Sequence, residues 1–167
     1  MKYFQKTASP LGNILLAADE HGLTGLWFEG CRYYGVGLSP KSIEKDLPVF
    51  ADTKTWLDIY FSGQIPVFTP ALHLTGTAFR LSVWALLLEI PYGSTVSYGL
   101  LANQFPSAKG KGRMSAQAIG CAVGHNPVSL IVPCHRVIGA NGALIGYGGG
   151  LERKQALLAH EGVILSA

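Results

Sequence analysis

Short β-prone runs and turn-forming residues follow one another along the first part of the chain. The three runs most prone to form β-strands, each followed by turn-forming residues, are residues 3–8, 13–18 and 23–28. This pattern is typical of an antiparallel hairpin or meander. After a predicted loop at residues 31–40, we expect helices at residues 41–45 and 51–61, and then an extended linker at residues 65–75. Residues 1–75 are therefore predicted to form a β-rich scaffold domain with a linker.

From residue 77 the apolar positions take a helical period. The first predicted helix covers residues 77–90 and ends before Pro91. A second is expected from about Tyr98 to Gln104, and a third from about Ser115 to Gly124. Three helices in about 50 residues could be a helix-turn-helix, but the periodicity supports any small helical bundle equally well.

Composition sets broad limits on the class of protein. The chain has 167 residues, of which 49% are hydrophobic, enough for one core or two small ones. No apolar run approaches the roughly 18 residues of a membrane span, and the N-terminus does not resemble a signal peptide. Three cysteines do not suggest a disulfide framework. We therefore expect a reducing, intracellular setting, cytoplasmic or nuclear according to the source cell, and no membrane partner.

Charge is unevenly distributed over a modest net value of +3. Residues 1–75 hold six Lys and Arg against seven Asp and Glu, and residues 76–167 hold seven against three. The second part is therefore basic, which suits a polyanion, although many proteins with this charge bind none.

The candidate chemistry lies in this basic part, where Cys134 precedes His135. A thiolate is the nucleophilic form of cysteine, and a neighbouring base or cation that lowers the thiol pKa makes it reactive. Adjacency alone does not ensure this, because successive side chains of an extended backbone point to opposite faces. A buried cysteine beside a surface histidine would be the simpler interpretation of the dipeptide by itself.

Four elements around the dipeptide occur in a fixed order. They are Asn126-Pro127, the PCHRV segment at residues 133–137, the GYGG segment at residues 146–149, and Leu157-Leu158 followed by His160-Glu161. This set resembles the O6-alkylguanine-DNA alkyltransferases, and the likeness is dense over residues 76–162. The resemblance implies an α/β fold of the α+β kind, with a small mixed or antiparallel sheet domain at residues 1–75. Residues 76–167 would form a winged helix-turn-helix-like domain that places its third helix in the DNA minor groove.

The same resemblance implies direct DNA repair. An alkyl group would move irreversibly from O6-alkylguanine in duplex DNA to Cys134, after the nucleotide has been rotated out of the helix. Each molecule would act once, because the thioether has no easy route back. The implied partner is alkylated double-stranded DNA, with no cofactor and no metal. We expect a monomer, and cooperative assembly on DNA remains open.

Five residues carry the implied chemistry. Cys134 would be the nucleophile, His135 would take its proton through a water molecule, and Glu161 would orient His135. Asn126 would tie the turn after the third helix to the active-site strand. Tyr98 would donate a proton toward the leaving guanine.

A larger set would bind DNA or the extruded base. Tyr147, with Gly148 and Gly149, would line the base pocket. The third helix has small or uncharged residues that suit either tight packing or a groove, and the resemblance favours the groove. Its implied contacts are Ser115, Ala116, Gln117 and Gly120, beside the basic loop residues Lys109, Lys111 and Arg113 and the motif residues Arg136 and Val137. For Arg136 both structural pairing and phosphate contact are open. Many relatives carry arginine where Gln117 stands, so we expect weaker base flipping or a different damage preference.

Two alternatives remain at this point. A lesion-binding relative without transfer activity would lack the reactive cysteine, which is present here. A Cys-His hydrolase would turn over repeatedly and need an oxyanion hole, for which no distinct signal is seen. The sequence does not set the preferred alkyl size, activity on O4-alkylthymine or the role of the N-terminal part.

Overall fold

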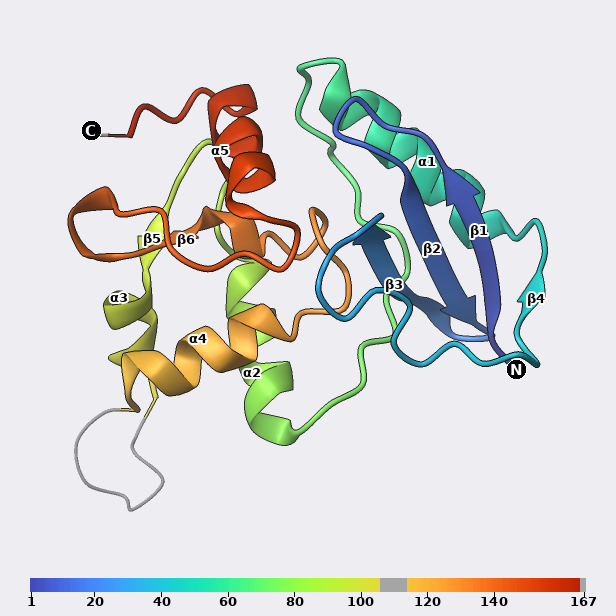
Figure 1. Cartoon of the computed structure of the whole chain (residues 1–167), viewed down its shortest axis with the longest axis horizontal. Coiled ribbons are helices and arrows are strands. Elements are labelled where there is room, and N and C mark those ends of the chain that lie inside the picture. Colours follow the sequence, from blue (N-terminus) through green and yellow to red (C-terminus); the bar gives the residue numbers. More distant parts are fainter. Residues whose placement is uncertain (106–113, 166–167) are drawn as a thin grey trace. The chain divides into compact units, whose positions relative to one another are not determined.

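The computed structural model describes residues 1–105 and 114–165 (Figure 1). The chain forms two compact units. The first unit comprises Met1–Thr75 and Pro127–Ile131, and the second comprises Gly76–Asn126 and Val132–Ala167. The first unit takes in residues 127–131 as well as the N-terminal part, and this short return of the chain was not anticipated.

The first unit is built on a four-stranded sheet with the order β3-β2-β1-β4. Its strands are β1 (Tyr3–Thr7), β2 (Ile14–Asp19), β3 (Gly22–Phe28) and β4 (Ile43–Glu44). The pairs β1–β2 and β2–β3 are antiparallel, as the short β-prone runs separated by turns predict, and β4 runs parallel to β1.

The helix predicted at residues 41–45 is wrong, because these residues include β4. Ile43 N donates to Lys2 O at 3.0 Å and Lys45 N donates to Phe4 O at 3.2 Å. A helix this short gains few internal hydrogen bonds for the cost of nucleation. Pairing with β1 satisfies the same backbone groups.

Apolar side chains cover the sheet on both faces. Helix α1 (Pro48–Phe61) lies along one face in Figure 1, and it buries Phe50, Trp56, Leu57 and Tyr60. It starts three residues before the prediction because Pro48 suits the first helical turn, where its missing N–H is not needed. On strands β2 and β3, Leu15, Ala17 and Trp27 form a second cluster with Phe4, Cys31 and Leu38.

The outer edge of β3 is paired by two segments from elsewhere in the chain. Leu23 N donates to Ala71 O and His73 N donates to Leu23 O, both at 2.8 Å, so the predicted linker lies along this edge. Further along the strand, Leu26 N donates to Pro127 O at 2.9 Å. These bonds satisfy backbone groups that an open sheet edge would expose.

The second unit carries helices and a small two-stranded sheet (Figure 1). The helices are α2 (Ala78–Leu87), α3 (Tyr98–Ala102), α4 (Ala116–Gly124) and α5 (Leu151–His160). The parallel strands are β5 (Val96–Ser97) and β6 (Val137–Ile138), and two 3-10 turns are η1 (Cys134–Arg136) and η2 (Ala140–Gly142). No described helix combines the length and the hydropathy needed to cross a membrane.

Side-chain caps fix where the three predicted helices begin. The hydroxyl oxygens of Thr77, Ser97 and Ser115 accept hydrogen bonds from backbone N–H groups in the first turns of α2, α3 and α4. Helix α4 packs on α2 and α3, and the Trp84 indole N–H donates to Ala122 O at 2.9 Å. The three-helix arrangement predicted from the sequence is confirmed, with α2 ending at Leu87 rather than at residue 90.

Candidate active site

Cys134 lies in a tight turn and not in a strand. Cys134 N donates to Val132 O at 2.8 Å, and Arg136 N donates to Pro133 O at 3.0 Å. The strand expected at the cysteine begins only at Val137, so that part of the prediction is wrong. Pro133 has no N–H to pair in a sheet, which favours the turn. Because the backbone turns, Cys134 and His135 are not forced to opposite faces as they would be in a strand.

His135 and Glu161 form a buried pair. His135 is 0% exposed, and its Nε2 lies 2.6 Å from Glu161 Oε2. Glu161 caps the C-terminus of α5, and its carboxylate also accepts hydrogen bonds from Arg136 Nε at 2.8 Å and from Gly93 N at 3.0 Å. Burial alone would raise the pKa of Glu161, but the hydrogen bonds from His135 and Arg136 hold it well below its ordinary value. Glu161 is therefore a carboxylate at neutral pH.

The protonation of His135 follows from these surroundings. Burial lowers the pKa of His135 and outweighs the opposing effect of the Glu161 carboxylate, so the ring is neutral at neutral pH. A carboxylate at Nε2 assigns the single ring proton to that nitrogen. Nδ1 then carries the lone pair, and no hydrogen-bond partner for it occurs among the described residues. His135 is held in the tautomer of a base.

The thiol of Cys134 is not ionised in advance by its neighbours. Burial raises its pKa, while a hydrogen bond from Asn126 and the positive charge of Lys154 act in the opposite direction without overcoming it. In the resting protein the pKa of the Cys134 thiol is therefore raised and not lowered. A protonated thiol with a neutral imidazole requires the proton to leave during the reaction.

Asn126 joins the end of α4 to the turn that carries the cysteine. Its side-chain Nδ2 donates to Val132 O at 2.8 Å, and the residue is buried. This contact has the geometry of the tie that the resemblance implies, although it reaches the residue two before Cys134 instead of a strand.

Tyr98 opens α3 and presents a protonated phenol. Its hydroxyl donates to Ile145 O at 3.1 Å and lies 3.5 Å from Gly146 O. Burial and the negative charge that Cys134 can carry raise the pKa of Tyr98 to about 12. The hydroxyl is therefore a proton or hydrogen-bond donor over the physiological range.

Lys154 belongs to this constellation, and the sequence reasoning missed it. Its ammonium is buried and donates to Val137 O at 2.5 Å and to Ile145 O and Gly146 O at 3.0 Å each. Burial lowers the pKa of Lys154 to about 8, although a negative charge at Cys134 acts to raise it. A signal was available, because residue 154 stands at i−3 and i−4 from the apolar pair 157 and 158 and at i−7 from Glu161, on one helical face.

The sequence left two roles open for Arg136, structural pairing and phosphate contact, and in the structure its side chain is paired within the protein. The residue is 8% exposed, and its guanidinium donates to both carboxylate oxygens of Glu161 and to Ile90 O at 2.8 Å. The neighbouring Val137 is 0% exposed and pairs with Val96 in the small sheet. Neither side chain is free to contact DNA in this conformation, so the expected DNA contacts of Arg136 and Val137 are not supported.

The segment proposed for the base pocket follows β6. Tyr147 and Gly148 are partly buried, and Gly149 is buried. A Cβ on Gly149 would lie 2.6 Å from the Tyr147 ring. Only glycine lets the ring lie this close to the backbone.

Helix α4 divides into a packed face and an open face. Ile119, Ala122 and Val123 are buried, whereas the open positions are Ser115, Ala116, Gln117, Cys121 and Gly124. Gly120 is partly buried, and a Cβ there would lie 3.8 Å from the Tyr98 ring. The open face carries no acidic residue that would repel phosphate. Lys109, Lys111 and Arg113, expected beside this helix, lie outside the described residues.

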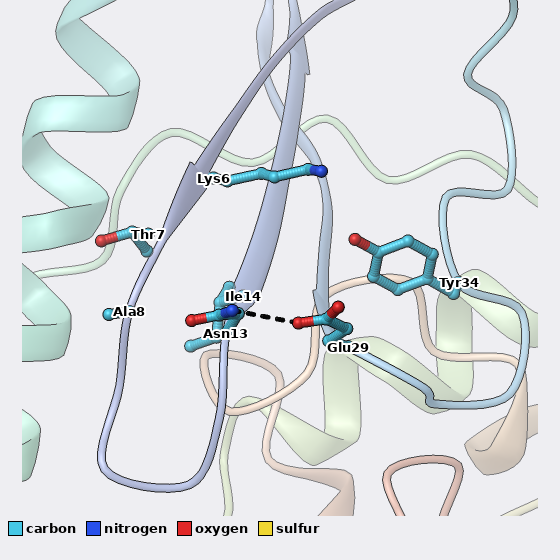
Figure 2. Close-up of a pocket in the computed structure, with 7 residues that line it drawn as sticks. All are labelled: Lys6, Thr7, Ala8, Asn13, Ile14, Glu29 and Tyr34. Atoms are coloured by element: carbon cyan, nitrogen blue, oxygen red, sulfur yellow. Dashed lines mark hydrogen bonds between the residues drawn. The ribbon is translucent and has the colours of Figure 1, made fainter.

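The first unit offers no comparable chemistry. The first unit has a pocket of about 260 Å³, and Figure 2 shows Lys6, Asn13, Glu29 and Tyr34 on its wall. Asn13 Nδ2 donates to Glu29 Oε2 at 3.1 Å. No nucleophile is paired with a base there. Among the described residues, no group of three or more His, Cys, Asp or Glu could hold a metal ion.

Comparison with known proteins follows the same division of the chain. The family model for the 6-O-methylguanine DNA methyltransferase DNA binding domain matches residues 78–163, and the model for its ribonuclease-like domain matches residues 2–74. The methylated-DNA–protein-cysteine methyltransferase of Mycobacterium leprae is 46% identical over 155 residues, which are 92% of this chain and 88% of the relative. That of Methanosarcina acetivorans is 42% identical over 96% of this chain and 98% of its own. The crystal structure of Mycobacterium tuberculosis OGT in complex with DNA is similar with a TM-score of 0.80 and 42% identity, over 95% of this chain and 92% of that one.

Proposed function

The chain belongs to the 6-O-methylguanine DNA methyltransferase family, and we propose that it repairs DNA by moving an alkyl group from O6-alkylguanine to Sγ of Cys134. The observation that carries the proposal is the buried set of Cys134, His135 and Glu161. A carboxylate holds the imidazole in the tautomer whose Nδ1 can accept a proton. The thiol beside it still has a proton to give.

The reaction balances with the residues present. The Cys134 proton passes through a bridging water to Nδ1 of His135, and the imidazolium that forms is paired with Glu161. Sulfur forms a bond to the alkyl carbon, the carbon–O6 bond breaks, and its electron pair stays on the guanine. Tyr98 supplies a proton to the guanine and later regains one, so the thiol proton is the one finally transferred. The thioether stays on the protein, and each molecule acts once.

Removal of water strengthens these interactions. The imidazole is fully buried and Cys134 is 7% exposed, so charges formed during transfer are stabilised by oriented groups rather than by solvent. Arg136 contributes indirectly, because its two hydrogen bonds keep the Glu161 carboxylate charged and fixed. We propose it as a positioning residue and not as a phosphate contact.

DNA is the proposed macromolecular partner, with the open face of α4 as the groove-facing surface. The exposed positions of this face are small or uncharged, which permits a close approach of the helix backbone to the duplex. Ser115, Ala116 and Gln117 lie at its N-terminal end. Gln117 would fill the space that the extruded guanine leaves. The basic residues Lys109, Lys111 and Arg113 would neutralise backbone phosphates.

We further propose that the protein acts as a monomer in a reducing compartment. The three cysteines are all free thiols in the structure, and the reaction needs Cys134 in that form. Cooperative assembly on DNA remains a separate hypothesis.

The decisive experiment measures the intact mass of the protein after incubation with a duplex that contains O6-methylguanine. We expect a permanent gain of one methyl group, which peptide mapping assigns to Cys134. The variant Cys134→Ala should gain nothing while retaining affinity for the lesion, and Cys31→Ser, which changes a free cysteine of the first unit, should behave as wild type. No gain by the wild-type protein with retained lesion binding would favour the lesion-binding alternative. A transient adduct on ester substrates would favour the hydrolase.

A further inference from the structure

The segment between α2 and β5 contacts the pair of Arg136 and Glu161 at three points. Ile90 O accepts a hydrogen bond from Arg136 Nη1 at 2.8 Å. The same guanidinium lies over the Tyr92 ring, with 5.7 Å between its Cζ and the ring centroid. Gly93 N donates to Glu161 Oε1 at 3.0 Å. One short segment thus contacts both members of this buried ion pair.

The absence of a side chain at Gly93 makes its contact with Glu161 possible. Ser94 N donates to Pro91 O at 3.1 Å, which closes a β-turn, and Gly93 has a φ of +78°. Residues with a side chain rarely adopt this conformation. A Cβ on Gly93 would also lie 3.2 Å from Glu161 O, so the turn and the C-terminal end of α5 would have to move apart to accept it.

The same stretch of chain carries the proposed proton donor. After the turn, Val96 of β5 pairs with Val137, which directly follows η1 (Cys134–Arg136). Helix α3 then begins at Tyr98, five residues after Gly93. One continuous segment therefore contacts the carboxylate beside the base and, a few residues later, presents the phenol.

We infer that Tyr92 and Gly93 are positioning residues for alkyl transfer, because they hold the Glu161 carboxylate in place. Both act through Glu161 and not on the substrate. The inference rests on the proposed function, since it assumes that Glu161 orients the base of that reaction.

Gly93 and His135 bind different oxygens of the Glu161 carboxylate. Gly93 N donates to Oε1, whereas Oε2 lies 2.6 Å from His135 Nε2. Arg136 donates to both oxygens, through Nε at 2.8 Å and Nη2 at 3.2 Å. The last torsion of a glutamate side chain has broad energy wells, so the carboxylate turns easily unless its oxygens are held. Without the bond from Gly93, Oε2 would be fixed less firmly opposite the imidazole.

The test compares Gly93→Ala with Gly30→Ala, because the two glycines occupy matching turns. Cys31 N donates to Phe28 O at 3.1 Å, and Gly30 has a φ of +81°, so alanine meets the same backbone strain at both positions. Gly30 belongs to the first unit, and among the described residues beyond its chain neighbours no atom lies within 4 Å of a Cβ there. The difference between the two variants therefore measures the contact with Glu161.

Two measurements are made on each folded protein. They are the single-turnover rate constant of transfer from an O6-methylguanine duplex and the ¹⁵N NMR signals of the His135 ring, which show which nitrogen carries the proton. Gly93→Ala should lower the rate constant by about tenfold, because the Cβ separates the turn from α5 and breaks a hydrogen bond to a charged group. Its His135 ring should show a second tautomer, with the proton on Nδ1. Gly30→Ala should keep the wild-type rate constant and the single tautomer.

Tyr92 supplies a second comparison that leaves the turn unstrained. Tyr92→Leu removes the ring beside Arg136 and should lower the transfer rate constant by about threefold, the effect of one cation–π contact. Tyr92→Phe keeps the ring and should recover most of the rate that Tyr92→Leu loses.

A single His135 tautomer in Gly93→Ala would overturn the inference whatever the rate constant, because any loss of rate would then not pass through Glu161. Equal losses of rate in Gly93→Ala and Gly30→Ala would overturn it as well. If Gly93→Ala does not fold, the Tyr92 variants decide, and a wild-type rate constant in Tyr92→Leu contradicts the inference. Failure of the wild-type protein to gain any alkyl group would instead refute the proposed function, so the two failures are distinguishable.

Discussion

The two units bury different kinds of side chain. In the first unit the buried polar residues among those described are Thr53 and Ser129, and the rest of the interior is apolar. In the second unit the buried polar and charged residues are Asn126, His135, Arg136, Lys154 and Glu161. The first interior is therefore stabilised mainly by apolar burial, whereas the second keeps ionisable groups away from water at a cost in stability.

This difference separates a scaffold from a reaction site. Apolar packing is non-directional and tolerates repacking, so it specifies a shape. A buried ionisable group is acceptable only when its partners are placed accurately, and the same placement makes it chemically useful. Glu161 of the second unit is an example, because its single carboxylate accepts hydrogen bonds from His135, Arg136 and Gly93.

The largest effect on this comparison is expected from Glu161→Gln. The substitution removes the charge that orients His135 and leaves the Arg136 guanidinium buried without a counter-ion. Transfer should slow by two or more orders of magnitude, and the free energy of unfolding should drop by about 3–5 kcal/mol. Single-turnover kinetics and urea unfolding measure the two effects. If the free energy of unfolding of the variant equals that of the wild type, the ion pair of Arg136 and Glu161 does not stabilise the second unit.

The variant Glu161→Gln also tests how the stability of the protein depends on pH. The pKa of Glu161 lies below its ordinary value of 4.5, so its contribution to stability is present above about pH 4.5 and is lost as pH falls toward the lower folded value. Wild-type stability should therefore decline with acidification through this range, and the decline should be smaller in Glu161→Gln. Parallel stability curves for the two proteins would contradict the assigned direction.

A smaller effect is expected from Gln117→Arg on the open face of α4. Arginine adds a positive charge at the position proposed to fill the emptied base stack, so affinity for DNA and the transfer rate should both rise by a few-fold. Binding at two salt concentrations separates the charge from the filling of space. Unchanged affinity and rate would remove the hypothesis that Gln117 weakens base flipping.

The smallest effect on chemistry is expected from Leu16→Ala in the first unit. Leu16 is 0% exposed on the central strand β2, so the cavity should lower the free energy of unfolding by about 2–5 kcal/mol. At urea concentrations below the unfolding midpoint, where Leu16→Ala is still folded, its single-turnover rate constant should stay at the wild-type value. A slowed reaction in a folded variant would show that the first unit does more than support.

The sequence was informative where local pattern decides structure. The short β-prone runs separated by turns predicted β1 to β3, and the helical period predicted α2 to α4, because these signals need no distant partner. It was wrong at residues 41–45, where pairing with β1 overrides a weak helical preference. The chemical residues followed from a family resemblance, since spacing alone did not establish that Cys134 and His135 cooperate.

The features of the site that could not be predicted from the sequence depend on burial. The raised pKa of Cys134, the pairing of Arg136 and the fully enclosed Lys154 all depend on how much water the folded chain excludes. A lysine in an amphipathic helix is usually expected at the surface, which is why its place beside the site escaped notice. The apolar residues 157 and 158 mark the same face of α5, but the charge of the lysine argued against placing that position inside.

The detour of the chain at residues 127–131 has a consequence for dissecting the protein. After Asn126 the backbone leaves the second unit, pairs with Leu26 in the first, and returns at Val132, where the Asn126 side chain closes the excursion. Cutting once near residue 75 would therefore take from the N-terminal half the segment that pairs with Leu26 of β3. The C-terminal half would keep residues 127–131 without the strand they pair with. The halves should recover a native fold only when mixed, as complementing fragments.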